Sequence, residues 1–488
     1  MESVHGAYAR FARPRVAAGV GVQDLFRQFC RISIADKFRF PRYANCITNS
    51  GADRHCAIRI SSAREYAKLQ ARAGKLGVCN PRERAIDLYS GHPWWLAKNG
   101  IVHSYPALRA DADCDVLIVG AGISGALIAN ALSAARMRVL MIDRREAAWG
   151  STAASTALLQ YEIDTELQEL ADMFGIDDAV LAYRACERAV RRLGMLTRSL
   201  RGTEFRPMQS LYLASHRRHE KRLRDEGRLR RDHGFDVQTL EPQGIRERFG
   251  IDAPVALLTA IAAEVDPYRL AHALLARMKR RGVGIHGRTE LARFQPKRGG
   301  IRVQTSDGVA IACRHLIFAA GYESQAYLDQ RVARNRSSYA FVSEPVEARL
   351  GAFRDTLAWE SARPYLYMRT TRDQRMIVGG LDDDVDIASK RDASVGRKTE
   401  KLLRQMRALL PDLALVPAFS WAGTFAETKD GLPFFGPHPQ HGPRVHFAMA
   451  YGGNGITYSV IGAEILLASL LGKKHPCAEL FSFGRLKR

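Results

Sequence analysis

The sequence lacks an apolar run long enough to cross a membrane, and it lacks paired cysteine motifs. Its most apolar late stretch, residues 457–471, covers only about four helical turns and contains Glu464. The eight cysteines are scattered, with no C-x-x-C pair and no His/Cys cluster at zinc spacing. Glycine and proline occur at ordinary frequency, which excludes collagen-like and low-complexity classes. We therefore expect a soluble, cytoplasmic globular protein with free thiols and no bound metal.

Length and charge further limit the domain organisation and the kinds of ligand that we expect. The chain has 488 residues, of which 46% are hydrophobic, so it can form two large domains or one domain interrupted by another. The formal net charge of +22 is compatible with nucleic acid, an anionic cofactor or an acidic substrate. The most basic stretch, residues 221–231, has the pattern of a solvated helix face. We therefore expect a small-molecule substrate and no nucleic acid, with RNA binding as the alternative.

Residues 1–85 differ from the rest of the chain in composition and in hydrophobic pattern. They are rich in arginine and show no clear hydrophobic periodicity. A targeting peptide, an accessory segment and upstream sequence included by an over-long gene prediction are the three interpretations, and we favour the third. Because every motif described below lies beyond residue 85, we expect an N-terminal extension that is disordered or forms no domain.

A β-α-β pattern begins at residue 115. Residues 115–119 are an apolar run typical of a buried parallel strand, residues 126–135 favour a helix of small residues, and residues 138–142 favour a second strand. The turn between the first strand and the helix reads G-x-G-x-x-G, formed by Gly120, Ala121, Gly122, Ile123, Ser124 and Gly125. These glycines permit a tight turn, close approach to a pyrophosphate, and packing of helix on strand. The pattern predicts dinucleotide binding at the helix N-terminus, and a structural glycine-rich turn is the alternative.

Residues after this motif distinguish FAD from NAD. Asp143 ends the second strand, where a carboxylate can bind ribose hydroxyls, and Arg144 follows it. A loop of small and hydroxyl residues comes next and suits the ribityl and pyrophosphate groups, although an ordinary turn would look similar. A strand at residues 316–320 ends in small residues, where a bulky side chain would collide with a cofactor, although many parallel strands end in this way. A last helix, at about residues 456–471, follows a glycine cluster.

Taken in order, these motifs resemble the D-amino-acid-oxidase-like FAD-dependent oxidoreductases, and most of all the glycine oxidase and sarcosine oxidase branch. The resemblance covers residues 115–472 and includes K-D-G-L-P at 429–433 and G-G-N-G-I-T at 452–457. It implies an α/β fold (α+β overall), in which a Rossmann-like FAD-binding domain of the glutathione-reductase type carries an inserted mixed-sheet substrate domain. We expect FAD-binding parts at 86–205, 256–335 and 421–488, the last with the C-terminal helix, and substrate-domain parts at 206–255 and 336–420.

The resemblance also implies the chemistry. Relatives hold FAD with its ring between the two domains, and the last helix directs its N-terminus at the N1–C2 edge of the ring, where negative charge collects. They transfer a hydride to flavin N5 from the carbon next to an amine nitrogen, and O2, a quinone or another carrier then takes the electrons. Some members bind FAD covalently through a cysteine near K-D-G, but no cysteine occurs between residues 314 and 476, so we expect noncovalent FAD. Besides the phosphate loop, Asp143 and Arg144, the expected FAD-binding residues are Ser151, Thr152, Ser155, Ala320, Gly321, Gly452, Gly453, Asn454, Gly455, Ile456 and Thr457.

The sequence departs from its relatives at the substrate site. Amino-acid oxidases of this branch bind the substrate carboxylate with an arginine two residues after a W-A-G segment, which is residues 421–423 here, and this chain has Phe425 at that position. Some add a second arginine just before N-G, where this chain has Gly453. We therefore expect an amine without an α-carboxylate, or a larger amino acid held elsewhere, with Arg369 as a substitute anchor or else a surface charge.

Because the substrate amine must be neutral for hydride transfer, the pocket needs no strong general base, and positioning can suffice. The candidate catalytic residues near the ring are Gln160, Tyr161, Tyr365, Tyr367, Arg369, Phe425 and Tyr451, and a structural role is the alternative for Gln160 and Tyr161. Three alternatives remain for the whole chain: a flavin enzyme acting on modified tRNA, an NAD-linked reductase, and a non-catalytic FAD-binding regulatory protein.

Overall fold

The computed structural model describes residues 88–346, 350–385, 387–449 and 451–487. They belong to one compact unit, Pro81–Arg488, so the prediction for residues 1–85 lies outside the described residues. Among the described helices, none has the length and apolar character needed to span a bilayer.

The first sheet has eight strands and carries the β-α-β pattern. Its parallel core has the order β18-β11-β2-β3-β8, β17 lies antiparallel at one edge, and β9 and β10 form an antiparallel extension of β11. The bounds are β2 Ala112–Val119, β3 Val139–Ile142, β8 Gly284–His286, β9 Leu291–Lys297, β10 Gly300–Thr305, β11 Ala310–Phe318, β17 Phe434–Pro437 and β18 Val445–Met449.

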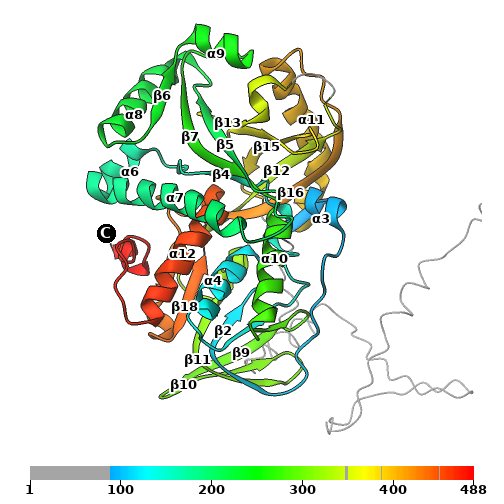
Figure 1. Cartoon of the computed structure of the whole chain (residues 1–488), viewed down its shortest axis with the longest axis vertical. Coiled ribbons are helices and arrows are strands. Elements are labelled where there is room, and N and C mark those ends of the chain that lie inside the picture. The colour runs from blue at the N-terminus through cyan, green and yellow to red at the C-terminus, as the bar shows by residue number, and fades with distance from the viewer. Residues whose placement is uncertain (1–87, 347–349, 386, 450, 488) are drawn as a thin grey trace, which may run out of the picture. The chain divides into compact units, whose positions relative to one another are not determined.

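Three helices lie side by side along one face of this sheet, namely α4 (Ile123–Ala134), α10 (Pro267–Arg280) and α12 (Gly455–Leu470) (Figure 1). Alternate residues of β2 serve the two faces: Val116 and Ile118 join the core under the helices, whereas Leu117 and Val119 join the core under β9 and β10. A strand that is buried on both faces reads as a continuous apolar run, which is why residues 115–119 were recognisable as a strand.

The second sheet has ten strands and is mixed. Its order is β1-β16-β12-β15-β14-β13-β5-β7-β4, with β6 also paired to β7; β13 and β5 are parallel and the other pairs are antiparallel. The bounds are β1 Tyr89–Gly91, β4 Leu158–Gln160, β5 Arg206–Leu213, β6 Val237–Leu240, β7 Ala256–Glu264, β12 Arg334–Ser343, β13 Thr356–Glu360, β14 Leu366–Thr370, β15 Met376–Asp383 and β16 Pro417–Glu427.

The two faces of the ten-stranded sheet belong to different cores. Val342 and Trp421 join the core shared with α4, α10 and α12, whereas their neighbours Phe341 and Ala422 join a separate core on the opposite face. Helix α11 (Ala388–Leu409) packs on β16, β12 and β15 and contributes Leu402 and Met406 to that separate core, and α9 (Pro242–Phe249) adds Ile245. One face of this sheet therefore packs towards α4, which begins at the dinucleotide motif, and towards its neighbours α10 and α12.

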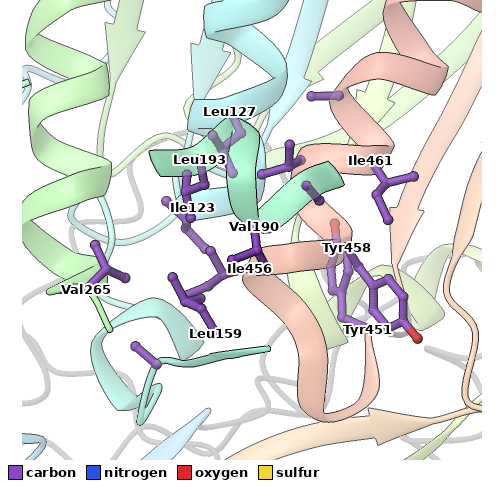
Figure 2. Close-up of a cluster of buried hydrophobic side chains, with 14 of the residues drawn as sticks. Ile123, Leu127, Leu159, Val190, Leu193, Val265, Tyr451, Ile456, Tyr458 and Ile461 are labelled. Atoms are coloured by element: carbon purple, nitrogen blue, oxygen red, sulfur yellow. The ribbon is translucent and has the colours of Figure 1, made fainter. Parts of the chain in front are cut away.

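A core of apolar side chains lies between the two sheets. Figure 2 shows part of this core, where apolar side chains of α4, α7 and α12 meet those of β4. The remaining helices are α3 Trp94–Asn99, α5 Ser151–Ala154, α6 Leu167–Phe174, α7 Ile176–Thr197 and α8 Glu220–Asp232, and the 3-10 helices are η2 Arg217–His219, η3 Gly321–Tyr327, η4 Gly351–Arg354, η5 Pro439–His441, η6 Gly452–Asn454 and η7 Phe483–Lys487.

Strand pairing departs from the predicted domain boundaries. Strand β7 begins at the predicted boundary 255/256, yet it pairs with β5 in the ten-stranded sheet instead of returning to the FAD-binding part. Strand β16 crosses the boundary at 420/421, and β1 and β4 join the same sheet from the predicted first FAD-binding part. An apolar run fits a buried strand of either sheet, so pairing alone decides its membership. The division into domain parts therefore stays a prediction, and strand pairing assigns β1, β4, β7 and β16 to the ten-stranded sheet.

Candidate functional site

The phosphate loop connects β2 to α4 in a conformation that only glycine permits at its first position. Gly120 has a φ of +112°, and a Cβ there would overlap the carbonyl oxygen of Ala319 at the end of β11. A Cβ at Gly125 would overlap the carbonyl of Gly120. The loop, the helix and the A-A-G strand end therefore approach one another closely, as the motif predicts.

The loop of small and hydroxyl residues after β3, residues 150–155, is the Ser-rich loop; it forms α5 beside this turn, and hydrogen bonds hold it there. Thr152 Oγ1 accepts a hydrogen bond of 3.0 Å from the Ile123 N–H at the start of α4. At the other end of α5, the indole of Trp421 donates to the Ala154 carbonyl (2.8 Å) and that of Trp95 donates to the Ser155 carbonyl (2.6 Å). We did not predict Trp95 as a residue of the site, although it lies in the H-P-W-W segment at residues 92–95.

The acid after β3 contacts the same loop. One oxygen of the Asp143 carboxylate accepts from the Ala121 N–H (2.7 Å) and the other accepts from the Arg145 N–H (2.8 Å). Burial raises the pKa of Asp143 above its usual range, against the lowering effect of these hydrogen bonds. Arg144 and Arg145 both pair with Glu323 on η3, so the arginine predicted to contact FAD is also an ion-pair partner within the protein.

These features fit FAD on structural grounds. The glycines leave no room for side chains where a pyrophosphate must approach the backbone, and α4 starts at that point. The hydroxyl of Ser151 is buried and has no hydrogen-bond partner among the described residues, and a buried polar group of this kind needs one. A phosphate or ribityl hydroxyl would supply that partner.

The glycine cluster before α12 joins the first part of the chain to the last. The Asn454 side chain donates to the Glu162 carbonyl just after β4, and the hydroxyls of Ser124 in α4 and Ser459 in α12 lie 2.7 Å apart. Gly453 N–H donates to Asp164 Oδ2 at 3.0 Å. The N-terminus of α12 is therefore placed next to the phosphate-loop helix, where the resemblance puts the flavin ring.

Two of the predicted catalytic tyrosines lie at this end of the ten-stranded sheet. Tyr365 O–H donates to Asp164 Oδ1 at 3.1 Å, and the hydroxyls of Tyr367 and Ser338 lie 3.3 Å apart. Burial, followed by the charge of Asp164, raises the pKa of Tyr365 well above its usual 10. Burial raises the pKa of Tyr367 to about 12. Both phenols therefore stay protonated at neutral pH and can donate hydrogen bonds.

The other candidates have structural surroundings. Tyr161 stacks on Phe235 at a ring distance of 5.6 Å, on the side of the molecule that faces α7, and Tyr451 donates to the Ala448 carbonyl at 2.8 Å within the core. Gln160 is buried in β4, and its carbonyl accepts from the Thr457 hydroxyl at 3.4 Å. These contacts favour a structural role for the three residues.

Arg369 does not stand free to bind a substrate. Its side chain is buried, Nη1 lies 3.0 Å from Glu264 Oε2, and Nε donates to the Thr156 carbonyl at 2.8 Å. A guanidinium with these partners is a structural ion pair, so the structure gives no support to the hypothesis that Arg369 replaces the missing arginines.

An acidic side chain lies beside one of the two positions where relatives have an arginine, and a basic residue lies opposite the other. Phe425 stands opposite Arg336 in the β16–β12 register, and Arg336 pairs with Glu427 at 2.7 Å. A Cβ on Gly453 would lie 2.8 Å from Asp164 Oδ2, so an arginine side chain there would begin against a carboxylate. We missed Asp164 in the sequence, where its only signal was its position shortly after the Ser-rich loop and β4.

The basic helix α8 carries ion pairs, of which those of Arg224 are partly exposed and that of Arg230 is buried. Arg224 pairs with Glu241 at 2.6 Å and with Glu220 at 2.9 Å, and Arg230 is buried on Glu226 at 2.7 Å. Its arginines therefore do not form an open cationic stripe. The described residues also hold no group of three or more side chains suited to a metal ion.

Comparisons with known proteins agree with this fold and with FAD as the cofactor. A model of the family described as FAD dependent oxidoreductase matches residues 115–469. The chain is 22% identical over 366 residues to the glycine oxidase of Bacillus licheniformis, a match that covers 73% of this chain and 93% of that protein. The crystal structure of glycine oxidase from Geobacillus kaustophilus superimposes with a TM-score of 0.64 at 20% identity, covering 76% of this chain and 98% of that one.

A tRNA-modifying enzyme is also similar. The tRNA 5-methylaminomethyl-2-thiouridine biosynthesis bifunctional protein MnmC of Polaromonas sp. (strain JS666 / ATCC BAA-500) is 24% identical over 409 residues, with 79% of this chain and 60% of that protein covered. The fold and site define a flavin-dependent oxidoreductase of the D-amino-acid-oxidase type. Since the family model matches well over half of its length, the chain belongs to the FAD dependent oxidoreductase family, and its cofactor is FAD.

Proposed function

We propose that the chain oxidises a C–N bond of a small amine that lacks an α-carboxylate. The single observation that carries this proposal is the acid at one of the two expected carboxylate anchors: the Gly453 N–H donates to the carboxylate of Asp164. Arg369, the predicted substitute anchor, is held by Glu264. A carboxylate on the substrate would meet Asp164, and like charges in a partly buried site repel each other strongly.

The reaction removes a C–H bond and an N–H bond from the substrate. FAD, held by the phosphate loop and Asp143, would supply the acceptor for the hydride, with its two electrons, from the carbon next to the nitrogen. The nitrogen loses a proton to water, a carbon–nitrogen double bond forms, and the resulting imine is hydrolysed by water to a carbonyl compound and a free amine or ammonia. O2, a quinone or another carrier takes up the electrons, as we expect from the sequence.

The protein would bind FAD and the substrate amine and orient them towards each other. The phosphate loop, Asp143 and the Ser-rich loop would hold the pyrophosphate and ribose groups, and the start of α12 would direct its N–H groups at the ring. Tyr365 donates its own proton to Asp164, so the hydroxyl oxygens of Tyr365 and Tyr367 would accept hydrogen bonds from the N–H groups of the neutral substrate amine and leave its lone pair free. The sheet and helices around them would exclude water from the transferred hydride.

Anaerobic flavin bleaching tests this proposal. The purified FAD-bound protein is mixed with a panel of alkyl amines and diamines, and separately with glycine, sarcosine and D-alanine. We expect reduction by at least one amine that is more than about a hundredfold faster, at equal concentration, than reduction by the three amino acids, because the loss of two charge-assisted anchors corresponds to two or more factors of ten. Fast, low-KM turnover of glycine or sarcosine would contradict the proposal.

A tRNA-bound substrate is the second candidate, and the similarity to MnmC is the observation that favours it. The paired arginines of α8 offer it no support. Flavin bleaching by a free amine, unaffected by added tRNA, would decide for the small molecule.

A further inference from the structure

A second carboxylate accompanies Asp164 in the neighbourhood of Tyr365. Burial and then the charges of Asp164 and Asp382, in that order, raise the pKa of Tyr365, so both carboxylates act on this phenol. The same two acids also affect Tyr367, on which Asp382 has the greater effect. The two acids come from separate parts of the chain, the loop after β4 and the end of β15, and the fold brings them to one place.

A distortion of β15 directs Asp382 to this place. Ile377 belongs to the core under the dinucleotide-motif helices, and strict alternation would place Leu381 on that face and Asp382 on the other. Gly380 has a φ of +136° and Leu381 a φ of +55°, and the register with β12 shifts between Ser337 and Tyr339. Leu381 consequently joins the opposite core. This bulge reverses the alternation, which turns Asp382 to the face that carries the tyrosines.

One oxygen of the Asp382 carboxylate lacks a hydrogen-bond donor among the described residues. This oxygen, Oδ1, is buried, while the carboxylate interacts with the Ser338 hydroxyl. Ser338 in turn contacts Tyr367. A buried carboxylate oxygen without a donor is costly, and native structures retain one where a ligand or an ion supplies the donor.

The nearby cations are committed elsewhere. Arg336 pairs with Glu427 at 2.7 Å and with Asp384 at 3.3 Å, although its charge also reaches Asp382. Arg363 donates to the backbone carbonyl of Asp164 and lies over the ring of Tyr365. Within the residues that the structure describes, neither Asp164 nor Asp382 forms an ion pair.

We infer that Asp164 and Asp382 form a cation-binding subsite, and that the substrate is an amine carrying a second, non-reacting ammonium group, as in an aliphatic diamine or polyamine. This inference rests on the proposed amine oxidation and names its substrate class. The reacting nitrogen has to be neutral, whereas the second nitrogen stays protonated and donates hydrogen bonds to the two carboxylates. The alkyl chain between the two nitrogens would lie along the rings of Tyr365 and Tyr367.

The experiment compares matched substrates on the FAD-bound enzyme. Anaerobic flavin reduction is measured with diaminobutane and butylamine, and with diaminopentane, pentylamine and aminopentanoate. We expect kcat/KM for each diamine to exceed that of its monoamine by about tenfold or more, and aminopentanoate to be the poorest of its set, because one charge-assisted hydrogen bond is equivalent to at least about a factor of ten. Most of the difference should appear in KM.

Variants then assign the preference to the acids. Asp382→Asn and Asp164→Asn should each reduce the diamine-to-monoamine ratio to near one, while Asp384→Asn, an exposed acid two residues from Asp382, should keep the ratio. Calorimetric titration of the oxidised enzyme with diaminobutane under anaerobic conditions gives a second readout, and Asp382→Asn should weaken this binding about tenfold. Equal FAD content in all variants shows that the fold is intact.

The outcomes separate the two proposals. Monoamines that reduce the flavin as well as diamines do, in the wild type, would refute the subsite and leave amine oxidation standing. Amines that never reduce the flavin would refute amine oxidation, and the titration would still decide the subsite: diamine binding that is weakened by Asp382→Asn supports it, and binding that is absent or unchanged overturns it.

Discussion

Arg369→Met is expected to destabilise the protein without changing its choice between acidic and neutral substrates. Arg369 is only 2% exposed, and its Nη1 contacts Glu264 at 3.0 Å. Methionine keeps much of the side-chain volume but removes the charge. Glu264 would then remain buried with Arg206 as its other ion-pair partner, at 2.9 Å.

The size of the effect follows from this geometry. Removing one partner of a buried ion pair costs about 3–5 kcal/mol, because the other charge stays buried without full compensation. For a chain of several hundred residues, the specific entropy of unfolding converts this loss into a fall in Tm of roughly 4–6 °C. Arg206 limits the loss, so the lower end of each range is the expected value.

The assay is thermal unfolding of the FAD-bound protein, together with KM for aminopentanoate and pentylamine. Arg372→Met is the matched control, because Arg372 is exposed in the adjacent turn and should change stability by less than about 0.5 kcal/mol. In a double-mutant cycle with Glu264→Gln, the double variant should be less destabilised than the sum of the single variants. An Arg369→Met protein that unfolds like the wild type, and loses only carboxylate-bearing substrates, would refute the reasoning and restore Arg369 as the anchor.

Three further predictions concern the cofactor and the acid pair. Acid precipitation should release all the yellow colour to the supernatant, and colour retained in the pellet would show a covalent link. Gly120→Ala should yield protein with little FAD, measured as the flavin-to-protein absorbance ratio, because the new methyl overlaps Ala319; Gly244→Ala, where a methyl meets nothing, should keep full FAD. Burial raises the pKa of Asp382 from 3.8 to about 6, so the folded protein binds this proton more tightly than the unfolded chain, and the ionised carboxylate lowers stability above that pH. Asp382→Asn should therefore raise Tm at about pH 8, by an amount equivalent to at most about 3 kcal/mol, and lose this advantage near pH 4, and an equal gain at both pH values would contradict the assignment. The charged and titratable groups that act on the Asp382 carboxylate are Asp164, Arg336, Glu427, Tyr365 and Tyr367. They stay unchanged in the wild type and in Asp382→Asn, so the difference in Tm between the two proteins reports on Asp382.

The residues that determine the dinucleotide fold were visible in the sequence because they act locally. Gly120 needs a left-handed backbone, Asp266 caps α10 by accepting from the Arg269 N–H at 2.9 Å, and the apolar run before Gly120 forms a strand buried on both faces. Each of these requirements involves a few consecutive residues. The fold class and the FAD cofactor that follow from them are confirmed by the family match and by the solved relatives.

Residues whose roles depend on distant partners could not be assigned in this way. Arg369 looked like a free cation until tertiary packing placed it against Glu264, more than a hundred residues earlier in the chain. Strand β7 has the composition of either sheet, and only its pairing with β5 decides its membership.

The acid pair illustrates the same limit. The sequence by itself determined that two arginines are missing, at Phe425 and Gly453, because that comparison needs only motif positions. It could not show what stands in their place, since Asp164 and Asp382 lie far apart along the chain and Asp382 faces Tyr365 only because a bulge in β15 reverses the side-chain alternation. Backbone hydrogen bonding between strands sets that register, and the register exists only in the folded sheet.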